Sequence, residues 1–209
     1  ELARTTPLLT DTETGAETQG AILVGVALGS VTEAEESLEE LKSLTDSCGV
    51  SVRDTILQRR QTIHPQFIVG KGKLKDLAIQ ALRTGAETII FDHDLTPNQM
   101  RSITDFTEIK VVDRTQLILD IFAQRAKTRD GKIQVELAQL RYRLPRLLHR
   151  NTGLSRLAGG IGGTGPGETK LEIDRRRVRD RIHRLEKQVE RLRKERRTRR
   201  ARRNQSGLP

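Results

Sequence analysis

The sequence AILVGVAL, from Ala21 to Leu28, sets the fold class of the first half of the chain. Its apolar residues follow one another without alternation, which is typical of a strand buried on both faces of a parallel sheet. Ser30 and Thr32 then offer N-caps for a helix that runs to about Ser47, with leucines on one face. The stretch therefore predicts the first strand and the first crossover helix of an α/β domain.

Strand and helix patterns continue to alternate downstream of this stretch. Further strands are predicted at Val50 to Gln58, Thr88 to Phe91 and Lys110 to Val112, and the strand-like residues Phe67 to Val69 lead into Gly70. This alternation predicts an α/β fold over residues 21–126, with a small parallel sheet of about four strands and flanking helices. Residues 1–20 have no hydrophobic period and are expected to be a disordered leader.

The apolar period changes after Gly131. Five apolar positions from Ile133 to Leu147 step by 4, 3, 4 and 3, and five positions from Val178 to Leu192 repeat these steps. Two matching seams around a glycine-rich segment predict a long antiparallel α-helical hairpin of coiled-coil type over residues 127–203. Its tip would be the glycine-rich loop 151–168, and residues 204–209 are expected to form a linker.

Charge is divided unevenly along the chain, whose formal net charge is +10. Residues 1–140 hold 16 basic and 21 acidic residues, whereas residues 141–209 hold 22 basic and 7 acidic residues, a net of −5 against +15. Because seven acids cannot neutralise 22 bases, the C-terminal third is expected to bind a polyanion. The alternative is a solvated helix face with internal ion pairs.

Arginines and glycines gather around the expected tip of the hairpin. Guanidinium groups make forked contacts to phosphates, and a loop without side chains can bring backbone amides into a narrow RNA crevice. The scarcity of aromatic residues argues against base-stacking modules, and arginines at both ends of the second seam disfavour a basic zipper. The predicted RNA-binding residues are Arg143, Arg146, Arg150, Arg156, Gly159, Gly160, Gly162, Gly163, Thr164, Gly165, Pro166, Gly167, Lys170, Arg175, Arg176 and Arg177.

Two motifs in the α/β part are candidates for chemistry. The run Gly70, Lys71, Gly72 and Lys73 precedes a predicted helix whose N-terminal amides and two lysines would face a phosphate, although a tight structural turn is the preferred interpretation. The run Asp92 to Asp94 ends a strand, where active-site residues often collect, but no nucleophile or metal partner lies nearby in sequence. The chain has no Walker A motif, and we predict no catalytic residue and no metal site.

The single Cys48 excludes an internal disulfide, and no Cys/His spacing suits a metal, so a reducing, cytoplasmic setting is expected. No apolar run approaches the roughly 20 residues that cross a bilayer. We also expect a monomer.

Several long strings resemble the HflX family of ribosome-associated GTPases. They are FIVGKGKLKDL (67–77), IIFDHDLTPNQMR (89–101), DRTQLILDIFAQRAKT (113–128), GKIQVELAQLRYRLPRL (131–147) and GGIGGTGPGETKLEIDRRRVRDRI (159–182). The resemblance implies an α/β domain and a helical hairpin ahead of a Ras-like G domain that uses GTP and Mg²⁺. It also implies binding to the large ribosomal subunit and the splitting or rescue of stalled ribosomes.

By the same resemblance, Gly159 to Glu168 would reach toward ribosomal RNA near the peptidyl transferase centre, and ATP binding by the α/β domain would fall near Gly70 to Lys73. The G domain should begin just after Pro209, so we expect an excerpt of a longer product that neither binds nor hydrolyses GTP by itself. Two alternatives stay open. One is an independent nucleotide-binding enzyme domain with its site at Gly70 to Lys73 and Asp92 to Asp94, and the other is a coiled-coil module that binds no RNA.

Overall fold

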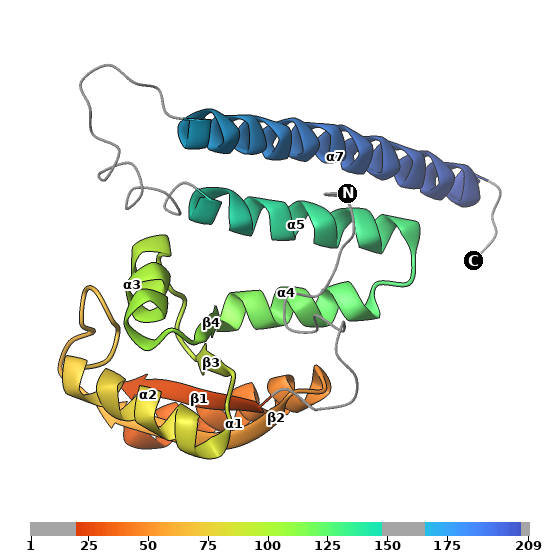
Figure 1. Ribbon diagram of the computed structural model, residues 1–209. Helices are drawn as coiled ribbons and strands as arrows, with labels where there is room; N and C mark the ends of the chain where they lie inside the picture. The colour runs from red at the N-terminus through yellow and green to blue at the C-terminus, as the bar shows by residue number, and fades with distance from the viewer. Residues whose placement is uncertain (1–19, 148–165, 206–209) are drawn as a thin grey trace. The chain divides into compact units, whose positions relative to one another are not determined.

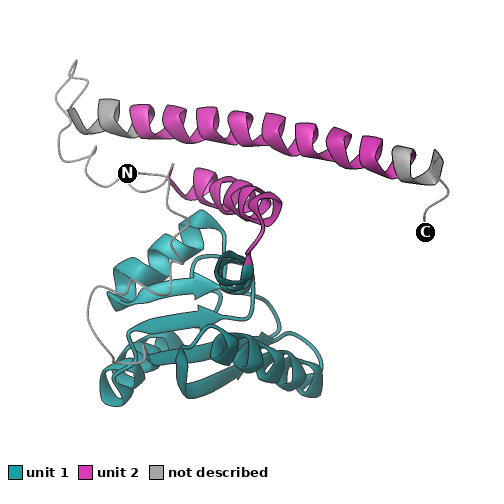
Figure 2. Ribbon diagram, turned by 90° about the vertical axis from the view of Figure 1, so that its right-hand side faces the viewer, with its two compact units in different colours: residues 1–125 teal, residues 126–209 magenta. Residues whose placement is uncertain are grey.

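A computed structural model describes residues 20–147 and 166–205, with side chains in the last helix described from residue 172 to residue 201 (Figure 1). The chain forms two compact units, residues 1–125 and residues 126–209 (Figure 2). The expected leader, nearly all of the expected tip loop and the end of the expected linker lie outside the described residues.

The first unit is built on a four-stranded parallel sheet with the order β2-β1-β3-β4. The strands are β1 (Gly20–Ala27), β2 (Ser51–Arg59), β3 (Thr88–Phe91) and β4 (Lys110–Asp113). Every residue of β1 is buried, and β1 pairs with a neighbour on each side. The predicted α/β fold with a small parallel sheet and flanking helices is therefore confirmed.

Helices cover both faces of this sheet. They are α1 (Val31–Ser47), α2 (Lys71–Thr84), α3 (Pro97–Thr107) and α4 (Arg114–Arg125). The side chains of β1 alternate between two apolar clusters: Ile22 and Val24 pack with α2 and α3, whereas Ala21 and Leu23 pack with α1 and α4. A strand covered on both faces needs apolar residues at successive positions, which explains the unbroken run in the sequence.

Local signals fix the ends of these helices. Ser30 caps α1 by accepting from the amide of Glu33 at 3.3 Å, and Thr96 forms a capping box with Gln99 at the start of α3. Gly85 ends α2 in the left-handed conformation that favours glycine.

The strand-like residues Phe67 to Val69 do not join the sheet, so the prediction was wrong here. Ile68 has a φ of +66°, and the amide of Val69 donates to the carbonyl of Phe67 at 2.7 Å, which closes a tight γ-turn. Ile68 pairs only with His64, in an isolated antiparallel bridge. All three residues are buried in the cluster of α2 and α3, so their apolar character reflects burial rather than strand pairing.

The second unit contains α5 (Arg129–Leu147) and α7 (Pro166–Gln205), which lie side by side in Figure 1. Their shared core takes its residues from both predicted seams, namely Ile133, Leu137, Leu140, Ile182, Leu185, Val189 and Leu192. Pro145 lies inside α5, two residues before its end. The segment that would close the hairpin falls outside the described residues, so the antiparallel hairpin with a glycine tip stays a prediction.

Cys48, the C-cap residue of α1, is only 5% exposed, and burial together with the nearby charge of Asp120 raises the pKa of its thiol from 9.0 to about 11. The unfolded thiol ionises at the lower pH, so the stability that Cys48 contributes is complete below pH 9 and is lost as pH rises through about 11. We expect urea denaturation to show a larger loss of stability between pH 8.5 and 11 for the parent chain than for Cys48→Ala. Parallel pH curves would contradict this.

Candidate nucleic-acid interface

α7 is the most highly charged element that the structure describes. Its 40 residues hold 17 basic and 7 acidic side chains, a net of +10, over a helix about 60 Å long at 1.5 Å per residue. Its residues Ile182, Leu185, Val189 and Leu192 form a narrow apolar seam against α5, and most of its described basic side chains lie in solvent. Such a helix can present guanidinium groups to a polyanion along much of its length.

Five of the predicted RNA-binding side chains fall in the described part of the chain. Arg176 and Arg177 are exposed, and Arg177 makes only a long ion pair of 3.6 Å with Asp174. Arg175 and Arg143 are half-buried. The guanidinium carbon of Arg146 lies 3.4 Å from the ring centroid of Tyr142, and Arg146 donates a hydrogen bond to the Tyr142 carbonyl. This side chain is therefore already engaged within its own helix.

The other predicted RNA-binding residues have no described side-chain geometry. Arg150, Arg156, Gly159, Gly160, Gly162, Gly163, Thr164 and Gly165 lie outside the described residues, and Pro166, Gly167 and Lys170 belong to the first turns of α7.

Several arginines of the second unit serve its own stability. Arg181 makes a forked pair with Glu136 at 2.7 and 2.9 Å, Arg141 pairs with Glu186 at 2.7 Å, and Arg196 pairs with Asp130. The hydrogen bond to Glu136 is the main reason that the pKa of Arg181 is raised. Internal ion pairs were the alternative that the sequence left open, and acids on the first arm are the partners in two of these three. They show that part of the positive charge is balanced internally.

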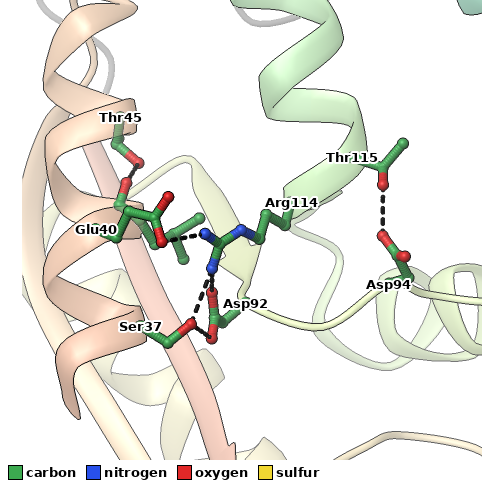
Figure 3. A network of polar contacts seen from close by, with 8 residues as sticks. Ser37, Glu40, Thr45, Asp92, Asp94, Arg114 and Thr115 are labelled. Atoms are coloured by element: carbon green, nitrogen blue, oxygen red, sulfur yellow. Dashed lines mark hydrogen bonds and ion pairs between the residues drawn. The ribbon is translucent and has the colours of Figure 1, made fainter. Parts of the chain in front are cut away.

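A second cluster of polar side chains lies in the first unit, where β3 and β4 end (Figure 3). Arg114, the first residue of α4, reaches Asp92 at 2.7 Å and Glu40 at 2.6 Å. Ser37 donates to Asp92 at 2.6 Å and accepts from Arg114 at 2.8 Å. Burial lowers the pKa of Arg114, but the hydrogen bonds to both acids outweigh it and raise the pKa overall. We call these four residues the Arg114 cluster.

Two more carboxylates at this edge are also engaged. Asp94 accepts a hydrogen bond from Thr115 at 2.6 Å, and buried Asp113 accepts from the amides of Leu95 and Gln116. Asp92 and Asp94 therefore have structural partners. The Nδ1 atom of His93, between them in the sequence, is buried and has no hydrogen-bond partner among the described residues.

The second motif, Gly70 to Lys73, lies at the start of α2. Gly70 is the N-cap and provides no side-chain cap, while its own amide donates to Gln58 at 3.0 Å. A Cβ at this position would lie 2.7 Å from Nη1 of Arg60, the far end of a flexible side chain that can shift, so close approach alone does not require glycine here. The motif begins α2, which packs on one face of the sheet, whereas Asp92 bonds to residues of α1 and α4, which pack on the other face.

Among the described residues, no group of three or more His, Cys, Asp or Glu side chains could hold a metal ion. Over the same residues, no helix is both long and apolar enough to span a bilayer.

Comparisons with known proteins give the same division of the chain. The family description "GTP-binding GTPase N-terminal" matches residues 35–123, and "GTP-binding GTPase Middle Region" matches residues 125–203. GTPase HflX of Caldanaerobacter subterraneus subsp. tengcongensis is 45% identical over 197 residues, which cover 94% of this chain and 46% of that protein. GTPase HflX of Escherichia coli is 47% identical over 174 residues, 81% of this chain and 40% of that protein.

Solved structures share the fold at lower identity. A GTP-binding protein from the hyperthermophilic archaeon Sulfolobus solfataricus, crystallised with GDP, superposes with a TM-score of 0.58 at 21% identity, covering 84% of this chain and 46% of that one. The chain thus spans less than half the length of these relatives. From the two matched regions and the identity to several relatives, the chain belongs to the HflX family of GTPases and carries the family's N-terminal and middle regions.

Proposed function

We propose that this chain is the ribosome-binding part of an HflX-type GTPase, and that its helical unit docks on RNA of the large ribosomal subunit. The observation that carries the proposal is the net charge of +10 on α7, with exposed guanidinium groups at Arg176 and Arg177 near the expected glycine tip. Each phosphate that such side chains neutralise releases a counterion, which gives strong, salt-dependent binding.

The negative charge exposed on the first unit, opposite to that of α7, supports docking through the helical unit. α1 exposes Glu33, Glu35, Glu36 and Glu39, with Lys42 as the only basic residue of the helix. This face would be repelled by phosphates, so the helical unit is the part suited to contact RNA.

In the intact protein, we propose that docking serves the splitting or rescue of stalled ribosomes, driven by GTP and Mg²⁺ in a G domain that follows this region. The protein would act in the cytoplasm as a monomer.

Cosedimentation with large ribosomal subunits at rising salt tests the proposal. We expect about 100-fold weaker binding when Gly159 to Gly167 are replaced by a short linker and Arg175, Arg176 and Arg177 by alanine, because several phosphate contacts are lost together. The matched control replaces three exposed bases of the first unit, Lys42, Lys75 and Arg83, with alanine and should bind normally. Unchanged binding of the tip variant would reject docking through the tip.

A second candidate is ATP binding by the first unit, favoured by the start of α2. There the N-cap supplies no side-chain acceptor, and Lys71 and Lys73 flank the first-turn amides. Calorimetry with ATP and GTP should show a binding heat that Lys71→Gln with Lys73→Gln removes. No heat at millimolar nucleotide would eliminate this candidate.

A further inference from the structure

We propose that the far end of α7, from Arg191 to Arg203, is a second phosphate-binding site for RNA, separate from the expected tip. The apolar seam of the helix ends at Leu192, and Arg196 pairs with Asp130, one residue from the start of α5. Beyond this pair α7 continues to Gln205 and extends past the first residues of α5 (Figure 1). We call Arg191 to Arg203 the distal segment.

The distal segment concentrates positive charge. Its 13 residues include nine basic side chains and a single acid, Glu195, over about 18 Å of helix. Arg191 pairs with Glu195 at 3.1 Å and Arg196 with Asp130. The other basic residues with described side chains are exposed and form no ion pair with any described residue; they are Arg193, Lys194, Arg197, Arg199 and Arg200.

The positive side chains point to every side of the helix axis. Successive helical residues are about 100° apart, so Arg193, Lys194, Arg196 and Arg197 already encircle the axis. A helix that is polar on all sides has no face for packing on a protein core. It is either a solvated spacer or a surface for a charged partner.

Charge repulsion within the segment favours a charged partner. Arg193 has Arg196 and Arg197 three and four positions ahead, and Arg199 and Arg200 continue the same spacing. Like charges at these spacings destabilise a helix, and the helix dipole favours cations only in the last turn. A polyanion would neutralise the repulsion, so this segment gains more from binding than an ordinary exposed helix face.

RNA fits this surface better than an anionic membrane does. From Arg193 to Gln205 the only apolar residue is Ala201, so the segment lacks the apolar face with which amphipathic helices enter a bilayer. Phosphates of an RNA backbone surround such a rod without needing an apolar contact. The choice of RNA as partner rests on the proposed function, whereas the presence of a polyanion site rests on the segment itself.

The test compares three versions of the chain. The distal variant changes Arg193, Lys194, Arg197, Arg199 and Arg200 to glutamine, which keeps both ion pairs and a good helix-forming residue at each position. A control changes five exposed bases of the first unit, Lys42, Arg53, Arg59, Lys75 and Arg83, to glutamine. The third is the tip variant described above, and circular dichroism checks that helix content is kept.

Binding to large subunits and to a short RNA duplex is measured from 50 to 300 mM salt. For the distal variant we expect the slope of log K against log salt to fall by about 4, because five basic side chains are removed and roughly 0.7 to 0.9 is lost per phosphate contact. The control should keep the parental slope.

The outcomes separate this inference from the proposed function. A parental slope in the distal variant, with weak binding of the tip variant, overturns the second site and leaves docking through the tip intact. A reduced slope in the distal variant, with normal binding of the tip variant, supports the second site and rejects docking through the tip. Equal affinity for phosphatidylglycerol vesicles and RNA at the same phosphate concentration would overturn RNA as the partner.

Discussion

Gly25→Val is expected to destabilise the first unit by about 3 kcal/mol, or to prevent its folding. Gly25 lies in the middle of β1, and a Cβ there would lie 2.9 to 3.2 Å from Cγ and both Cδ atoms of the Leu38 side chain. Leu38 is only 3% exposed on α1 and has no room to withdraw. The glycine therefore permits the close approach of α1 to the sheet. Urea denaturation followed by circular dichroism measures the effect.

Two controls separate this steric effect from a general loss of strand stability. Gly29→Ala should leave the unfolding midpoint nearly unchanged, because nothing lies within 4 Å of the position that its Cβ would take. Adding Leu38→Ala to Gly25→Val should recover part of the lost stability by making room for the new side chain. An unfolding midpoint of Gly25→Val equal to that of the parent would show that the close approach is unimportant.

Asp92→Ala is expected to cost about 3 kcal/mol, which is typical of removing one partner from a buried ion pair. The Asp92 side chain is 9% exposed, and it accepts from both Ser37 and Arg114. Its removal leaves the Arg114 guanidinium partly desolvated, with Glu40 as its remaining carboxylate partner. Chemical denaturation of the full chain measures the change.

The double variant Asp92→Ala with Arg114→Met should be more stable than Asp92→Ala alone, because the uncompensated charge is removed as well. Glu40→Ala should cost less than 1 kcal/mol or so, since the Glu40 side chain is 64% exposed and surface pairs contribute little. If Asp92→Ala and Glu40→Ala proved equally mild, the Arg114 cluster would not stabilise the fold.

The elements whose sequence pattern matches their burial could be predicted. The unbroken apolar run of β1 follows from its cover on both faces, and the two seams of α5 and α7 supply the residues of their shared core. Phe67 to Val69 could not be distinguished from a strand, because three buried apolar residues look alike in a turn and in a sheet. The residues around Ile68 do not predict its positive φ, because β-branched residues rarely adopt this conformation.

Less of the polar arrangement could be predicted. The Arg114 cluster joins three separate parts of the sequence: α1 with Ser37 and Glu40, then Asp92, then Arg114. Nothing in the sequence around any one of these parts indicates that it meets the others. Only the order β2-β1-β3-β4, which no local signal specifies, brings their elements to one edge of the sheet. For the proposed RNA contact, charge could indicate the helix, but which arginines are engaged in ion pairs depends on the packing of α5 on α7.

The Arg114 cluster also has a mechanical consequence. α4 ends at Arg125, and the helical unit begins at the next residue, so tension on the helical unit enters the first unit along α4. At the other end of α4, β4 is only four residues long and would resist a pull weakly. Because Arg114 fastens this end to α1 and to the end of β3, the pull is shared among three elements. The cluster thus fastens α4 to α1 and to the end of β3, so that tension along the chain would not peel β4 away from the edge of the sheet.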